Sequence, residues 1–262
     1  MKMLGTKIQT FLTVYYAHMM EYRAEIVFWM LAGLFPFILM GVWMEAGATG
    51  NFALSAIDLG RYFVAVFIVR QMSVVWVIWE FERQVVEGRL SPFLLQPIDP
   101  VWRHVAGHIA ERFARLPFFV VLLTGFFLFQ PQLFWWPSLE KGLAAVAAMI
   151  CAFVLRFLIQ YTFAMLCFWT ERASAVQEFW FLLYLFLSGL IAPLDVFPEE
   201  MREFALWTPF PYLVNFPARL LVGLEADLVR SFSILGAWMI FFFGLNRLLW
   251  RLGLRKYSGM GA

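Results

Sequence analysis

Charged residues are scarce in this sequence. Only 15% of its 262 residues are Asp, Glu, Lys or Arg, whereas 63% are hydrophobic and 19% are aromatic. An ordinary soluble domain has about 25% charged and about 45–50% apolar residues. A soluble globule of this length needs more polar surface than this composition provides. The composition therefore excludes a soluble enzyme and a disordered chain, and it predicts a polytopic membrane protein.

Cysteine and net charge are also low. The two cysteines, Cys151 and Cys167, lie in one apolar stretch, where helical spacing places them roughly 24 Å apart, too far for a disulfide. This excludes a secreted disulfide scaffold. The net charge of +2 shows no footprint of nucleic-acid binding. The lipid bilayer is the partner that the composition predicts.

Apolar runs predict six transmembrane helices, because backbone groups in lipid must be satisfied within a helix. The predicted spans are Ile26–Trp43, Arg61–Trp79, Phe113–Phe129, Leu143–Trp169, Val176–Pro193 and Leu228–Trp250. Residues 1–24 place apolar side chains on one helical face and predict an amphipathic helix in the membrane interface. With both termini in the cytoplasm, few basic residues fall outside, which the positive-inside rule favours. Those few are Arg61, Lys141, Arg202, Arg219 and Arg230.

The connection at residues 194–227 is apolar but too broken for a span. Prolines interrupt it, and we expect short re-entrant helices on the external side, shielded by protein. The prolines of this segment and its start are Pro193, Pro198, Pro209, Pro211 and Pro217.

The connection at residues 80–112 is cytoplasmic in this topology and is both charged and proline-rich. Gly88 can end the second helix in a left-handed conformation, Ser91-Pro92 predicts the start of a one-turn helix ending at Gln96, and Asp99-Pro100 predicts the start of the third long helix. The one-turn helix would present apolar side chains within a charged rim, which is typical of a docking site. The same pattern also fits a stiff loop that packs back on its own helices.

Two motifs give the sequence a resemblance to a known family. One runs from Glu87 to Ile98 and contains glycine, a basic residue, leucine and proline. The other runs from Ile191 through Thr208-Pro209-Phe210-Pro211-Tyr212 to Gly223. With six spans and an interfacial N-terminal helix, the chain resembles permease subunits of the ABC type-2 transporter superfamily. It is most similar to a bacterial branch in which two permeases are encoded beside one ATPase.

The resemblance implies a single transmembrane domain over residues 1–262, in the bacterial inner membrane. It implies that the cytoplasmic connection is a coupling helix docking on a dimer of separate ATPase subunits, which would bind ATP and Mg²⁺. The chain itself has no GxxxxGK[ST] phosphate loop and no cofactor motif. A second permease would complete the pathway of a small-molecule or multidrug exporter. The paired genes of that branch favour a heterodimer, and a homodimer stays open. The coupling residues would be Glu82, Arg83, Glu87, Gly88, Arg89, Leu90, Phe93, Leu94 and Leu95.

Two arginines lie in the middle of predicted spans, Arg70 in the second and Arg156 in the fourth. Each costs about 2.5–3.5 kcal/mol at the bilayer centre, so such residues usually face a cavity or the bundle interior. They are the candidates for a substrate pathway, although they could also lock the bundle. His104, His108 and Glu111 have the helical spacing of a metal site, but we expect no metal because an HExxH motif is absent.

Two other classes of function stay open at this point. A membrane-embedded enzyme that modifies lipids or isoprenoids needs clustered carboxylates or histidines at a membrane face. A secondary transporter needs acidic residues within its spans or half-helix ion sites. The sequence offers few of either, and no nucleophile and base are recognisable. We therefore expect a non-catalytic subunit.

Overall fold

Helices form all the regular structure in the described residues, which confirms the predicted all-helical membrane fold. The computed structural model describes residues 10, 13–17, 20–21, 23–50, 52–170 and 172–257. The predicted interfacial helix at residues 1–24 falls largely outside these ranges. In chain order the helices are α2 (Arg23–Ala32), α3 (Phe35–Ala48), α4 (Ala56–Ser73), α5 (Val77–Val86), α6 (Ser91–Leu94), α7 (Val101–Phe129), η1 (Pro131–Leu133), α8 (Leu139–Ala164), η2 (Met165–Phe168), α9 (Ser174–Leu187), η3 (Leu194–Val196), α10 (Glu199–Trp207), η4 (Pro211–Leu213), α11 (Asn215–Val222) and α12 (Leu228–Lys256).

Five stretches of the described chain are long and apolar enough to cross a bilayer, and they cover the predicted first, second, third, fourth and sixth spans. The predicted fifth span differs. Its helix, α9, has 14 residues and ends at Leu187, short of the predicted end at Pro193. At 1.5 Å per residue it is about 21 Å long, less than the roughly 30 Å of a bilayer core. The chain turns at Gly189, whose φ of +83° is readily adopted only by glycine.

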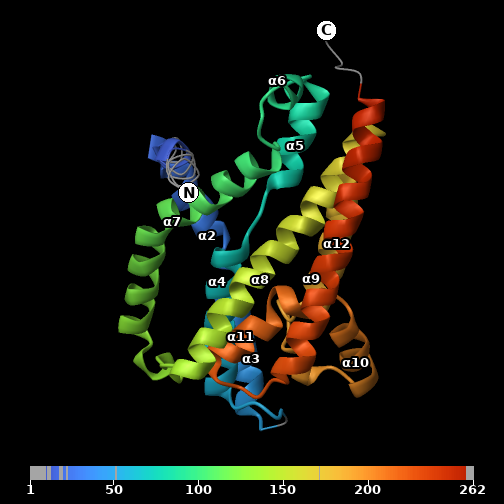
Figure 1. The fold of residues 1–262 in the computed structure, drawn as a ribbon. Coiled ribbons are helices and arrows are strands. Elements are labelled where there is room, and N and C mark those ends of the chain that lie inside the picture. The colour runs from blue at the N-terminus through green and yellow to red at the C-terminus, as the bar shows by residue number, and fades with distance from the viewer. Residues whose placement is uncertain are drawn as a thin grey trace.

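The second span is interrupted, which periodicity did not predict. Helix α4 ends at Ser73, and Val74 has an extended backbone with ψ of 141° before α5 begins at Val77. The third span is one helix, α7, which carries Pro117 inside it. Figure 1 shows α7 bending midway along its length, as a proline that lacks an N–H group is expected to cause.

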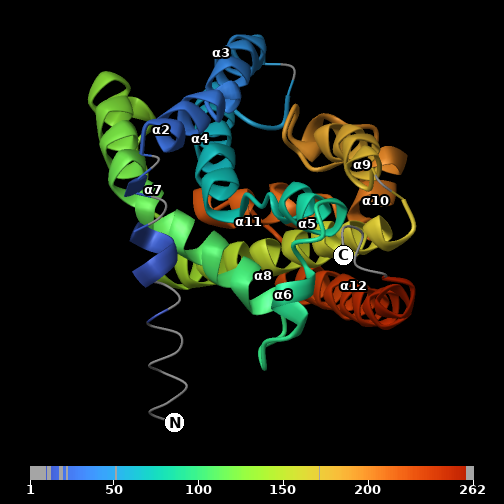
Figure 2. The same ribbon diagram turned by 90° about the horizontal axis from the view of Figure 1, so that it is seen from above.

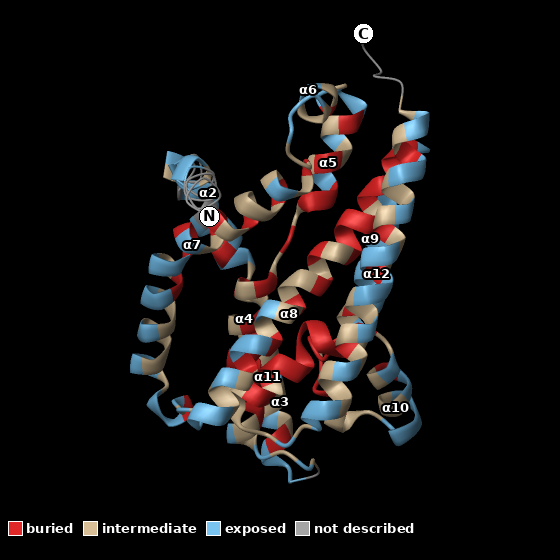
Figure 3. Cartoon of the chain, in the orientation of Figure 1, coloured by how far each residue is buried: buried red, intermediate tan, exposed pale blue. Residues whose placement is uncertain are grey.

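The core centres on α4, which packs against α3, α8 and α11. Tyr62 and Phe63 of α4 are fully buried and belong to one cluster with Leu155 of α8, Phe216 of α11 and Phe242 of α12. Figures 1 and 2 show α8 and α12 side by side, with α4 on the other side of α8. Figure 3 shows that burial is concentrated around α4, α8 and α11, while the part of α7 after Pro117 is exposed or half-buried apart from Phe119. Figure 1 places α6 and the end of α12 at one end of the bundle, here called the loop end, and α10 at the opposite end.

The proline-rich segment after α9 folds into η3, α10, η4 and α11, as short helices were expected here. Pro198 immediately precedes α10, and Pro211 is the first residue of η4, where a missing N–H costs least. The hydroxyl of Tyr62 lies 2.8 Å from the carbonyl oxygen of Gly189 and 2.9 Å from Oδ1 of Asn215. The hydroxyl of Tyr212 donates to the carbonyl of Leu206, and burial raises the pKa of Tyr212 to about 12. Side-chain contacts therefore fix this segment against α4.

Candidate functional site

The connection between α5 and α7 folds as a tight hairpin. Gly88 has a φ of +69°, which confirms the predicted left-handed helix stop. The amide of Leu90 then donates to the carbonyl of Gln84 at 3.0 Å, which turns the chain back on α5. The short helix α6 covers Ser91–Leu94, so the predicted end at Gln96 is two residues too far. Ser91 does not cap this helix, because Leu90 holds the cap position and Ser91 is the first helical residue. The Ser91 hydroxyl instead lies 3.1 Å from that of Tyr257.

Some apolar side chains of this hairpin are buried, and others are exposed. Leu90 is fully buried, and Leu94 packs on the same cluster from a half-buried position. Phe93 is half-buried beneath the guanidinium of Arg103, which lies 4.4 Å from the ring centroid. Leu95, by contrast, is 89% exposed at the loop end. The hairpin thus packs back on its own helices and still presents one leucine outwards.

Of the predicted charged rim, Glu87 and Arg89 pair with each other at 2.9 Å on the surface, and Arg83 is exposed. Glu82 points the other way. Its carboxylate accepts from the amide of Ser174 at 2.7 Å and from the Ser174 hydroxyl at 3.1 Å. This contact joins α5 to the first turn of α9.

The interruption of the second span is held by an arginine from α7. The last carbonyls of a helix have no partner within it, and in a membrane each needs one. Nε of Arg112 donates to the carbonyl of Met72 at 2.6 Å, and Nη2 donates to that of Val74 at 2.7 Å. Arg112 also lies over the ring of Phe153. A residue expected at the cytoplasmic start of the third span therefore supports a break inside the second.

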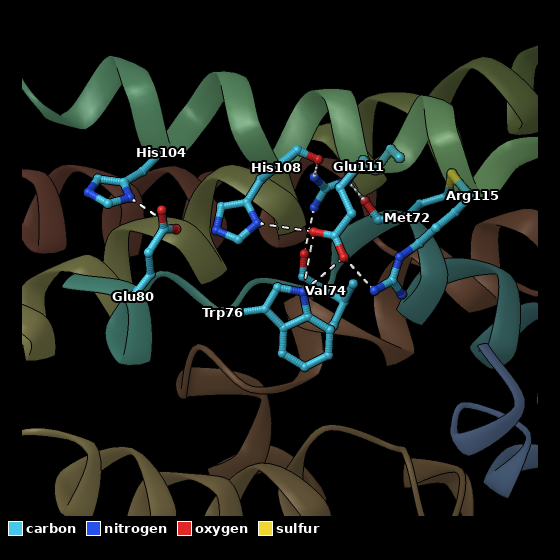
Figure 4. Close-up of polar contacts among 9 residues, drawn as sticks. Met72, Val74, Trp76, Glu80, His104, His108, Glu111 and Arg115 are labelled. Carbon is cyan, nitrogen blue, oxygen red and sulfur yellow. Dashed lines mark hydrogen bonds and ion pairs between the residues drawn. The ribbon is translucent and has the colours of Figure 1, made fainter. Parts of the chain in front are cut away.

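One turn of α7 contributes a buried carboxylate next to this break. Glu111 accepts from Nε1 of Trp76 at 3.0 and 3.2 Å and pairs with Arg115. Figure 4 shows Trp76, His108 and Arg115 converging on this carboxylate, while His104 faces Glu80. The two histidines thus lie beside different carboxylates rather than sharing one ligand position. Among the described residues no group of three or more His, Cys, Asp or Glu could hold a metal.

Beside this cluster lies a cavity of about 250 Å³ between α2, α4, α7, α8 and α9. It brings together Arg70 and Arg156, the two arginines predicted for a pathway, and adds Arg115 from α7. The guanidinium of Arg156 lies 4.6 Å from the ring centroid of Tyr184. The walls of the cavity include the buried side-chain amides of Gln71, Gln160 and Gln177, together with aromatic side chains. The lining residues include no Asp or Glu.

The family model that describes an ABC-2 family transporter protein matches residues 27–261. The chain belongs to this family. The match covers nearly all of the sequence and includes the hairpin and every lining residue of the cavity. No curated protein matches the chain. This family membership, together with the apolar helices, indicates that the chain is a multi-pass membrane protein of the transporter class.

Within this ABC-2 fold, sequence reasoning found Arg70 and Arg156 but missed the contribution of α7. Arg112 was placed in the connection at residues 80–112, because the apolar run was taken to start at Phe113, and Arg115, near the start of that span, was given no role in the pathway. A signal was present, since Glu111 and Arg115 have the i, i+4 spacing of a helical ion pair. At the start of α9, Ser174 and Gln177 have the sequence spacing of a capping box, but they do not form one. Residue Ala173 precedes the helix, Ser174 binds Glu82, and Gln177 lines the cavity.

Proposed function

We propose that this chain is the transmembrane permease subunit of an ATP-binding-cassette exporter and forms half of its substrate pathway. A separate ATPase dimer, which binds ATP and Mg²⁺, docks on the hairpin between α5 and α7. A second permease, in a heterodimer, completes the pathway. The chain lies in the bacterial inner membrane with both termini and the hairpin in the cytoplasm. Membership of the ABC-2 family supports this proposal.

The observation that carries the proposal is a continuous physical connection from hairpin to cavity. The hairpin leaves Leu95 exposed at the loop end, and its preceding helix is bonded to α9 through Glu82 and Ser174. Helix α9 in turn contributes Gln177 and Tyr184 to the cavity. A force applied at the hairpin would therefore reach the cavity through α5, the hydrogen bonds between Glu82 and Ser174, and α9.

Co-purification of the ATPase tests this proposal. We expect an ATPase subunit to co-purify with the full chain, and Leu95→Asp or Glu87→Arg to release it while the permease stays folded. Leu139→Asp is the matched control, because Leu139 is 81% exposed at the start of α8, away from the loop end. An active chain that transports with no ATPase bound would overturn the proposal and favour a secondary transporter.

A further inference from the structure

The cavity lined by arginines carries more positive charge than nearby carboxylates can neutralise. Arg70, Arg115 and Arg156 line it, and the lining residues include no acidic side chain. Glu111, which pairs with Arg115 from beside the cavity, offsets one of these charges. Arginine stays charged in proteins, and an unpaired buried charge is costly. Two positive charges therefore face this space without a carboxylate partner among its lining residues.

Several polar atoms at the cavity lack a hydrogen-bond partner among the described residues. They are Nε and Nη2 of Arg156, Nε of Arg115, the hydroxyl of Tyr184 and the Oε1 atoms of Gln160 and Gln177. Guanidinium groups can only donate, a hydroxyl can donate, and an amide can turn to present its NH₂ group. Arg115 is itself 95% buried, so bulk water does not satisfy it. A partner that supplies several acceptors together with negative charge, as a phosphate or carboxylate does, would satisfy these donors and the guanidinium charges.

The aromatic walls and the size of the cavity indicate what carries this anionic group. Trp29 and Phe181 line the cavity and are 50% and 44% exposed, so the cavity borders a surface that lipid would cover. Its volume of about 250 Å³ is below the roughly 300–1,000 Å³ of pockets that enclose a whole drug-sized ligand. The space therefore suits a headgroup whose apolar part stays outside, against the aromatic rings.

We propose that this cavity binds the phosphate or carboxylate headgroup of an anionic membrane amphiphile between Arg70, Arg115 and Arg156. The inference that this amphiphile is the substrate of the permease rests on the proposed function. The inference that the cavity binds such an amphiphile depends only on the geometry of this chain. Arg70 and Arg156 hold the headgroup, while Arg115 is fixed in place by Glu111.

Native mass spectrometry of the full-length chain in detergent tests the site. The probes are dioleoyl phosphatidic acid and dioleoyl phosphatidylcholine, which share acyl chains, with inorganic phosphate as competitor. We expect phosphatidic acid to bind at least about tenfold more tightly, and Arg70→Gln or Arg156→Gln to weaken its binding roughly tenfold each. Arg156→Lys should retain most of the binding, because it keeps the charge. Arg61→Gln is the control, since Arg61 is on α4 but outside the cavity and donates to the carbonyl of Phe134.

Equal binding of the two lipids, or binding that neither glutamine variant changes, would overturn the proposal. If Arg70→Gln does not assemble, Arg156→Gln and Arg156→Lys still decide between charge recognition and mere packing. Inorganic phosphate that competes at the same concentration as the lipid would show that the ligand is a free anion and not an amphiphile. The lipid measurement needs no ATPase, so a failure of ATPase co-purification refutes the proposed function and leaves this readout intact.

Discussion

The carboxylate of Glu82 accepts hydrogen bonds from both the backbone amide and the hydroxyl of Ser174. It thereby occupies the position of a cap at the start of α9, supplied by another helix. Negative charge at a helix N-terminus is favourable because it satisfies free N–H groups and opposes the helix dipole. The contact therefore fastens α5, which precedes the hairpin, to α9, which lines the cavity.

Breaking this contact should weaken the transmission of force without removing the ATPase. Glu82→Gln and Ser174→Ala should each lower the stability by about 1–2 kcal/mol, since hydrogen bonds to charged groups contribute more than neutral ones. We expect ATPase co-purification to persist while transport per ATP hydrolysed falls in proteoliposomes.

The two substitutions act on one contact, so the double variant should lose less than the sum of the single losses. Glu178→Gln, on the exposed surface of α9, serves as the control and should leave both readouts unchanged. Additive losses in the double variant would show that the two residues act separately.

Gly189 should tolerate no side chain, for two independent reasons. Its φ of +83° is strained for alanine, and a Cβ atom there would lie 2.5 Å from the hydroxyl of Tyr62 and 2.8 Å from Cβ of Asn215. Gly50 also has a positive φ, +76°, but open space around it. Gly189→Ala should therefore destabilise the protein by at least about 2 kcal/mol more than Gly50→Ala, because overpacking adds to the shared strain. Thermal unfolding in detergent measures the difference, and equal losses would contradict the close packing at Gly189.

Arg112 should be required for the interruption of the second span. Arg112→Gln removes the donors to the carbonyls of Met72 and Val74, and each buried group left unpaired costs about 1–3 kcal/mol. Arg112→Lys should recover part of the loss, because an ammonium group can still donate but lacks the planar fork of arginine. Unfolding midpoints in detergent compare the three proteins, and a glutamine variant as stable as the parent would show that the carbonyls find other partners.

Structural features that depend on the residues at that position could be predicted from the sequence. Features that depend on packing between distant segments could not. The apolar runs located most spans, and Gly88 and the prolines marked the turns, because these residues restrict the backbone directly. The stop at Leu187 depends on Tyr62 and Asn215, which lie far away in the chain. The break at Val74 depends on Arg112 of another helix. For the site, charge within an apolar run revealed Arg70 and Arg156, but the packing of α7 against this break added Arg115.

Two leucines of the hairpin should separate folding from docking. Leu90 is fully buried and Leu95 is 89% exposed, although they lie only five residues apart. Leu90→Ala should lower stability by about 2–5 kcal/mol, as expected for a buried leucine that leaves a cavity, and should affect ATPase binding only once the hairpin unfolds. Leu95→Ala should leave the unfolding midpoint unchanged and weaken ATPase co-purification, because exposed apolar anchors contribute to interfaces rather than to the fold. If both substitutions change stability alone, the hairpin is a structural loop and the ATPase docks elsewhere.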